Sequence, residues 1–182
     1  MIHSSTISSI YLEHIDSLYA YAMHLGFEEN LALDAIHDVF YKLCISESAI
    51  ENVTNIKFYL FRALKNRLID IRRTGKQHAN IEITLENGRQ ELPFKLHVTV
   101  EDELIEKEEQ EAIRKKVEKV LDKLTDRQRE IIFLRYIHEY EYEQIAELMG
   151  ISVLSCRNLV SKALGILKES SLTIAFILLR VW

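Results

Sequence analysis

Residues 142–168, YEQIAELMGISVLSCRNLVSKALGILK, carry the pattern that decides the fold, two short helices joined by a tight turn. Gly150 permits the turn, Ile151 plugs the angle between the helices, and Ser152 can cap the second helix. Apolar residues recur at three- and four-residue steps, as on the buried face of a helix, at Ile145, Ala146, Leu148 and Met149 and then at Cys156, Val160, Ala163 and Leu167. The spacing predicts helices over about 142–149 and 153–168 in a helix-turn-helix.

The opposite face of the second helix is the one that a recognition helix presents to the major groove of DNA. Arg157 and Asn158 are candidates for reading base edges, and Ser155 and Lys162 suit phosphate oxygens. The full predicted contact set is Leu154, Ser155, Arg157, Asn158, Ser161 and Lys162. Such a helix pair can also serve packing alone, but the small and capping residues at the turn all agree with DNA binding.

Composition extends the helical prediction to the whole chain. The 182 residues include one Pro and five Gly, and 48% are apolar, which favours an all-α protein over a sandwich or barrel. Helical spacing recurs over about 7–23, closed by Gly26, and then over 31–43 and 58–71; Thr125 and Gln128 fit a capping box before a further helix. We expect two small helical domains, over 1–75 and 111–170, joined by a linker over 76–110 and followed by an apolar tail over 171–182.

Charge is sorted into blocks along the chain. The net charge of -5 speaks against DNA binding by bulk charge alone. From Lys57 to Lys76, however, seven bases accompany one acid, Asp70, and from Glu101 to Glu111 seven acids accompany one base, Lys107. The basic block can track a phosphate backbone. The acidic block is either a solvated helix face or a mimic of nucleic acid in a basic channel, and alternating apolar residues in the linker fit short strands or extended segments on a partner.

The chain ends and cysteines indicate the compartment. The N-terminus lacks a basic start with an apolar run, so we expect a cytoplasmic protein. Cys44 and Cys156 form no metal or disulfide motif, and both are expected to be reduced and mostly buried. The apolar stretch over 172–182 is shorter than the ~20 residues that span a bilayer. It is expected to pack on the C-terminal domain or to cover a surface that an inhibitor uses.

Three segments together resemble a known family. Residues 124–168 look like the fourth conserved region of bacterial RNA polymerase sigma factors. ALDAIHDVFYKLC, at 32–44, is similar to a second-region helix of the extracytoplasmic-function (ECF) subgroup, and FYLFRALKNRLIDIRR, at 58–73, resembles the promoter-binding helix that follows it. The segments stand in the family's order, and no insertion corresponds to the third-region domain of larger sigma factors. The resemblance therefore implies the two-domain ECF subgroup.

The resemblance implies a promoter-specificity subunit that binds core RNA polymerase and performs no covalent chemistry. The C-terminal domain would read the minus-35 element and the N-terminal domain the minus-ten element, with the connector at 46–55 capturing an unstacked base. Candidate minus-ten contacts are Asn66, Arg67, Arg72, Arg73 and Lys76, with Asp70 as an intramodule partner of one base. Candidate contacts to the clamp helices of the large polymerase subunit are Asp34, His37, Asp38 and Lys42.

Some positions depart from the family pattern. His37 stands where Gln is usual, Cys44 where Trp is common, Leu154 where a small or polar residue is frequent, and Leu159 where Arg or a polar residue is usual. The resemblance further implies an anti-sigma partner, often membrane-anchored. It implies no catalytic residue, no metal, no cofactor and no small-molecule substrate.

Two other functional classes fit parts of the sequence. A helix-turn-helix transcription regulator that is not a sigma subunit would need a receiver or ligand pocket, and residues 1–75 lack the strand and helix alternation of a receiver. A helical metalloenzyme is suggested by seven His and many carboxylates. A di-metal bundle wants two Glu-x-x-His motifs, and the chain offers Asp34-x-x-His37 once.

Overall fold

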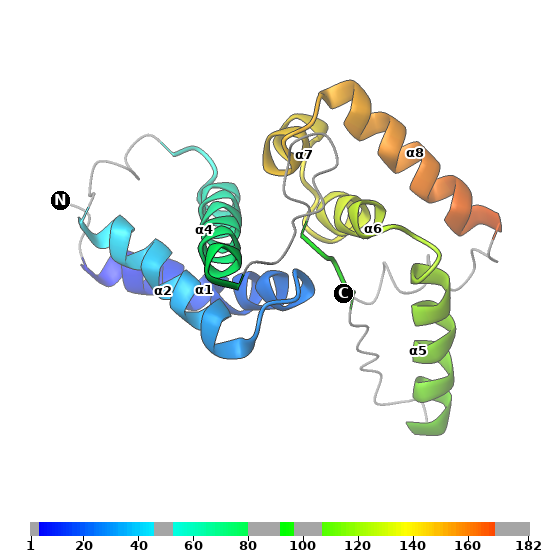
Figure 1. Cartoon of the computed structure of the whole chain (residues 1–182), viewed down its shortest axis with the longest axis horizontal. Coiled ribbons are helices and arrows are strands. Elements are labelled where there is room, and N and C mark those ends of the chain that lie inside the picture. Colours follow the sequence, from blue (N-terminus) through cyan, green and yellow to red (C-terminus); the bar gives the residue numbers. More distant parts are fainter. Residues whose placement is uncertain (1–3, 46–52, 80–91, 97–106, 170–182) are drawn as a thin grey trace. The chain divides into compact units, whose positions relative to one another are not determined.

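A computed structural model describes residues 4–45, 53–79, 92–96 and 107–169 (Figure 1). All regular structure in these ranges is helical, which confirms the all-α prediction. The chain divides into two compact units, residues 1–93 (unit 1) and 94–182 (unit 2), and each has its own apolar core.

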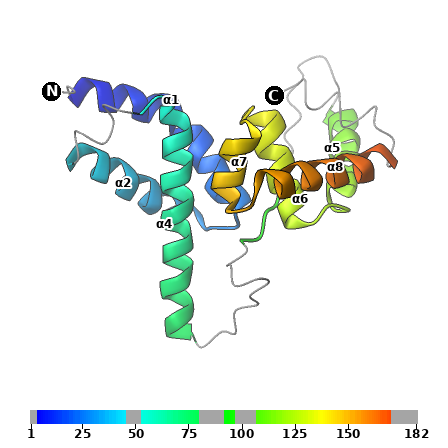
Figure 2. The ribbon, with the colours of Figure 1, turned by 90° about the horizontal axis from the view of Figure 1, so that it is seen from above.

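Unit 1 consists of three mutually packed helices, α1 (Ser4–His24), α2 (Glu29–Ile45) and α4 (Ile56–Ala79). In Figure 2, α4 crosses the α1–α2 pair and its C-terminal half extends past both helices. The centre of the core is aromatic, because the rings of Tyr21 and Phe61 are both fully buried with centroids 5.0 Å apart. Gly26 ends α1 with a φ of 76°, a left-handed conformation that glycine adopts without strain. This confirms its expected role as the helix stop.

The bounds of α4 differ from the expected ones. Asn55 caps its start, since the backbone N–H of Phe58 donates to Asn55 Oδ1 at 2.9 Å. The helix then continues through Gly75 to Ala79, although the helical pattern was expected to end near residue 75. A single glycine inside a helix costs only about 1 kcal/mol, so Gly75 alone does not stop it.

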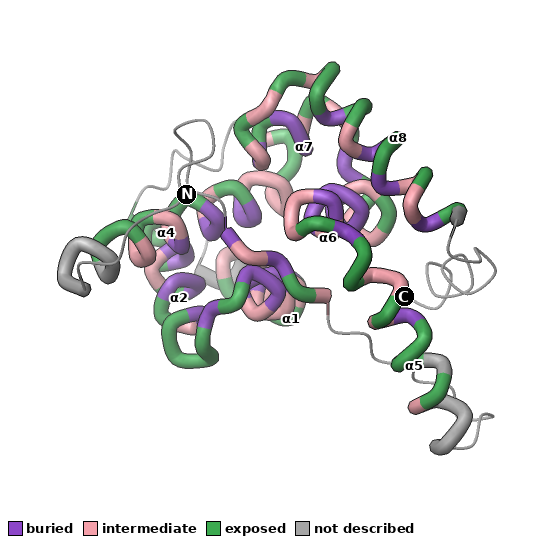
Figure 3. The backbone as a smooth tube through the Cα atoms, turned by 45° about the vertical axis from the view of Figure 1, so that its right-hand side comes forward, coloured by how far each residue is buried: buried purple, intermediate pink, exposed green. Residues whose placement is uncertain are grey.

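Unit 2 contains α5 (Lys107–Leu121), α6 (Asp126–Ile132), the π-helical turn η1 (Phe133–Ile137), α7 (Tyr142–Met149) and α8 (Val153–Glu169). The capping box at the start of α6 is present as predicted, with Thr125 and Gln128 each bonding the other's backbone N–H. The core lies where α6 and α7 pack against α8, and Figure 3 shows the buried positions concentrated on these inner helix faces. No single helix in the described ranges is both long and apolar enough to cross a membrane; α7 and α8 meet that test only as a pair bent by 98°.

The two thiols differ in exposure, which corrects the expectation that both are mostly buried. Cys156 is buried, whereas Cys44 is exposed near the end of α2. Cys44 directly follows the buried Leu43, and the sequence alone does not show that its side chain is exposed. The packing of the helices in unit 1 decides whether a residue at the edge of the apolar stripe faces solvent. Burial, with a smaller contribution from the charge of Glu143, raises the pKa of the Cys156 thiol.

This difference predicts that a thiol reagent such as Ellman's reagent modifies one cysteine of the native protein at pH 8. Cys44 reacts because it is exposed, and Cys156 stays unmodified because it is shielded and forms little thiolate. The Cys44→Ser variant should show no fast reaction, and denaturant should release the second thiol. Equal reaction of both thiols in the native chain would contradict the described core.

Two glycines of unit 2 form a matched pair for a stability test. Gly150 has a φ of 63°, so an added Cβ at this turn is strained by about 1–2 kcal/mol. Gly165 lies within α8, exposed, and an added Cβ there would meet nothing within 4 Å. Gly150→Ala should therefore lower the free energy of unfolding, and Gly165→Ala should raise it by about 0.5–1 kcal/mol. Denaturant titration followed by circular dichroism measures both, and the same sign for the two changes would contradict the turn geometry.

Candidate nucleic-acid interface

The helix-turn-helix consists of α7, the turn at Gly150 and α8. The chain bends by 98° between the two helices. The helix bounds of α7 match the predicted 142–149. Ser152 caps α8 as predicted, since its Oγ accepts the backbone N–H of Ser155 at 3.1 Å. The predicted inner stripe of α8 is buried at all four of its positions, Cys156, Val160, Ala163 and Leu167.

The predicted DNA-contacting residues all lie on the exposed face of α8, namely Leu154, Ser155, Arg157, Asn158, Ser161 and Lys162. Leu154 is 69% exposed, so this large apolar side chain is not part of the core of unit 2. The Oγ atoms of Ser152 and Ser155 are 2.8 Å apart, which places two hydroxyls together at the start of the helix. Within the first three turns of α8, the face thus offers side chains of the types that in DNA-binding proteins contact base edges and phosphates, together with one apolar side chain.

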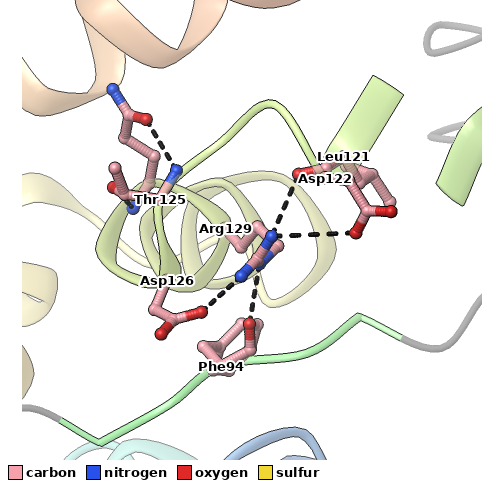
Figure 4. A network of polar contacts seen from close by, with 7 residues as sticks. Phe94, Leu121, Asp122, Thr125, Asp126 and Arg129 are labelled. Atoms are coloured by element: carbon pink, nitrogen blue, oxygen red, sulfur yellow. Dashed lines mark hydrogen bonds and ion pairs between the residues drawn. The ribbon is translucent and has the colours of Figure 1, made fainter. Parts of the chain in front are cut away.

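An arginine network supports α6, on which α8 packs (Figure 4). The side chain of Arg129 is 15% exposed; its Nε donates to the Phe94 carbonyl at 2.7 Å and an Nη donates to the Leu121 carbonyl at 3.3 Å. The same guanidinium pairs with Asp126 and lies 4.0 Å from Asp122. The ring of Phe94 is fully buried, with its centroid 5.4 Å from that of Phe133. Phe94, which belongs to the expected linker, is therefore packed and hydrogen-bonded within unit 2.

The basic helix α4 holds its predicted minus-ten residues in different environments. Asn66 and Arg73 are exposed, and Arg73 forms an ion pair with Asp70 at 3.0 Å, which confirms the expected intramodule role of Asp70. Arg72 is half-buried, with its guanidinium 5.8 Å from the centre of the Phe27 ring. Lys76 belongs to α4, but its side chain lies outside the described residues, as do residues 46–52 of the connector.

One ion pair joins the two predicted surfaces of unit 1. Arg67, a predicted minus-ten contact, donates from Nε to Asp38 Oδ2 at 2.7 Å, and its Nη lies 2.6 Å from the same oxygen. Asp38 was assigned to the polymerase surface, yet it is only half-exposed and points to α4. Because Arg67 and Asp38 are 29 positions apart and lie on different helices, no spacing within one helix indicates this pair.

The other predicted polymerase contacts, Asp34, His37 and Lys42, are exposed on α2. His37 Nε2 lies 3.2 Å from the Tyr11 hydroxyl, so α1 fixes the position of this imidazole. Sequence reasoning missed two exposed apolar side chains on the same helix, Tyr41 at 66% and Ile45 at 65%. Tyr41 follows His37 by four residues and Ile45 follows Lys42 by three. This spacing places them on the same helix face as the predicted polymerase contacts and could have indicated them.

The described ranges contain no group of three or more His, Cys, Asp or Glu residues that could hold a metal ion. The Asp34-x-x-His37 motif therefore lacks a further ligand among these residues.

Comparison with known proteins matches both units. Residues 114–167 match the protein family described as Sigma-70, region 4. The chain is 23% identical over 167 residues to the ECF RNA polymerase sigma factor SigM of Bacillus subtilis (strain 168), covering 87% of this chain and 90% of SigM. It is 22% identical over 175 residues to the RNA polymerase sigma factor YlaC of the same organism, covering 93% and 94%.

Two solved structures share the fold. One is the sigma factor RpoE in complex with the anti-sigma factor NepR from Bartonella quintana, with a TM-score of 0.59, 22% identity and coverage of 90% of this chain and 94% of that chain. The other is CnrH in complex with the cytosolic domain of CnrY, with a TM-score of 0.55, 17% identity and coverage of 92% and 88%.

Proposed function

We infer that this chain is an alternative sigma factor of the extracytoplasmic-function type, which binds core RNA polymerase and directs transcription initiation. It is not an enzyme, because the polymerase performs the chemistry. In this proposal, unit 2 reads the minus-35 element through α8, and unit 1 binds the minus-ten element through α4 and the polymerase through α2. The single observation that carries the proposal is the match of both units, in order, to sigma factors along most of the chain.

The face of α8 supports the proposed minus-35 contact. A recognition helix needs a buried stripe that fixes its orientation and an exposed polar face near its N-terminus, and α8 has both. Arg157 and Asn158 are assigned to base edges, and Ser155 and Lys162 to phosphates. Ser161 and Leu154 complete the proposed contact surface.

The environments in α4 refine the proposed minus-ten contacts. Asn66 and Arg73 are exposed and are assigned direct contacts to DNA. Arg67 and Arg72 are held by Asp38 and Phe27, so we assign them to phosphates that approach these fixed positions. Lys76 completes the set, and the connector at 46–55 is the proposed site for a flipped base.

The exposed side of α2 is the proposed polymerase surface. Asp34, His37 and Lys42 supply its polar groups, and Tyr41 and Ile45 add the apolar area that a stable interface requires. Asp38 contributes to this surface through its pair with Arg67, which ties α2 to α4. An anti-sigma protein is the proposed regulatory partner. Of the two structural neighbours, RpoE is in complex with the anti-sigma factor NepR, and CnrH is in complex with the cytosolic domain of CnrY. The proposed compartment is the cytoplasm.

A charge reversal on α2 tests the polymerase surface. Asp34→Lys should weaken binding of the chain to core polymerase by roughly tenfold. The substitution replaces a negative charge in the proposed interface by a positive one and so removes its electrostatic complementarity to the partner surface. Asp16→Lys makes the same charge change on the exposed side of α1 and is the matched control. Fluorescence anisotropy of the labelled full chain titrated with core polymerase measures both affinities. Equal affinities for the two variants would remove α2 from the proposed interface, and no binding of the unsubstituted chain would contradict the proposed function.

A further inference from the structure

Tyr142, the first residue of α7, makes cation–π contacts with two arginines. The Cζ atom of Arg135 lies over the Tyr142 ring, 5.0 Å from its centroid, and that of Arg157 lies over the same ring at 5.5 Å. The three residues come from η1, α7 and α8 and are therefore brought together only by the tertiary fold. Both distances are within the roughly 6 Å range of a cation–π contact.

The base of this arrangement is fixed by several contacts. Arg135 donates an Nη hydrogen to the Tyr140 carbonyl at 2.8 Å and forms an ion pair with Glu141 at 3.3 Å. Glu141 in turn is the N-cap of α7, and its backbone N–H donates to Gln144 Oε1 at 3.0 Å. Tyr142 thus follows directly after a residue that is bonded both to α7 and to Arg135. The ion pair with Glu141 also partly neutralises the charge of Arg135, the guanidinium that shares the ring with Arg157.

Arg157 differs from Arg135 in what it contacts. Among the described residues, the recorded partner of its guanidinium is the Tyr142 ring, and no carboxylate or carbonyl pairs with it. A cation–π contact uses the charge of the guanidinium and none of its five N–H donors. The ring can therefore restrict where Arg157 lies while its donors stay available to a ligand.

We propose that Tyr142, held by Arg135 and Glu141, is a positioning residue that orients Arg157 for bidentate hydrogen bonding to the O6 and N7 atoms of a guanine in the minus-35 element. This inference rests on the proposed function. Guanine is the base whose major-groove edge presents two acceptors to an arginine fork. Ordering Arg157 before DNA arrives reduces the conformational entropy lost on binding, and the benefit appears only at the base pair that Arg157 reads.

The test uses core polymerase reconstituted with the full chain and a promoter library randomised over the minus-35 and minus-ten segments. Each promoter is linked to a transcribed barcode, and sequencing the barcodes in the transcripts identifies the promoters that were used. The unsubstituted chain should enrich guanine at one minus-35 position. Tyr142→Leu should reduce that guanine preference roughly three- to thirtyfold and leave the other positions unchanged. Tyr142→Phe keeps the ring and should retain the preference. Arg157→Ala should abolish the preference at the same position, and adding Tyr142→Leu to it should have no further effect there.

Each outcome decides between distinct possibilities. If Tyr142→Leu lowers transcription equally for all minus-35 sequences, or leaves the guanine preference unchanged, the positioning role is wrong although the chain is a sigma factor. If Tyr142→Phe behaves like Tyr142→Leu, the hydroxyl and not the ring acts, which also overturns the proposal. If the unsubstituted chain gives no promoter-specific transcripts, the proposed function itself fails and the positioning role falls with it.

Discussion

Arg129→Ala is expected to lower the free energy of unfolding of unit 2 by about 3 kcal/mol. The substitution removes the guanidinium that holds the Phe94 and Leu121 carbonyls and the Asp126 carboxylate, and it leaves these acceptors without their charged donor. Arg129→Lys should restore little of this stability, because an ammonium group lacks the planar fork that reaches several acceptors at once. Denaturant titration of the full chain, followed by circular dichroism, measures the change.

Arg114→Ala is the matched control for this prediction. Arg114 also pairs with an acid three residues earlier, Glu111, at 2.8 Å, but both side chains are more than two-fifths exposed. Solvent screens such a pair, so its loss should leave the unfolding midpoint nearly unchanged. Similar destabilisation by the Arg114 and Arg129 substitutions would show that the network at Phe94 adds nothing beyond an ordinary surface ion pair.

Arg157→Ala is expected to reduce transcription from a minus-35-dependent promoter by roughly one to two orders of magnitude. The estimate follows from the ~1–3 kcal/mol that a bidentate base contact contributes. Run-off transcription with reconstituted polymerase measures the loss, and the free energy of unfolding of the variant should stay close to that of the unsubstituted chain because Arg157 is exposed.

Lys168→Ala controls for charge alone, since this exposed base lies in the last turn of the same helix. It should lower transcription little and uniformly across promoter sequences. If both substitutions have the same effect on every promoter, Arg157 acts only through its charge, and the assigned reading of a base edge is wrong.

Local patterns were sufficient to predict the helix-turn-helix and which face of its second helix is exposed. The bounds of α7, the cap at Ser152 and the buried stripe of α8 depend on residues within a few positions of one another. A helix of fixed period then determines which side chains share the opposite face. For the same reason the capping box at Thr125 and the pairing of Asp70 with a base on its own helix could be predicted.

Contacts between distant segments could not be predicted in this way. The Arg67–Asp38 pair joins residues 29 positions apart, and the Arg129–Phe94 contact joins residues 35 positions apart. No periodicity within one helix specifies such partners. From the sequence, Tyr142 can be predicted only as the first residue of a helix. Its contact with Arg157 depends on the turn that brings α7 and α8 together.

Reconstituted transcription shows whether this chain acts as a sigma factor. Core RNA polymerase freed of other sigma factors is incubated with the purified full chain and with DNA from upstream of its own coding sequence, together with the randomised promoter library. We expect transcripts that start at defined positions and that require this chain, and we expect the promoters that yield them to share sequence at both the minus-35 and the minus-ten segment. Failure of the chain to bind core polymerase, or binding to DNA without any gain in specific initiation, would contradict the proposed function and would favour a helix-turn-helix regulator of another kind.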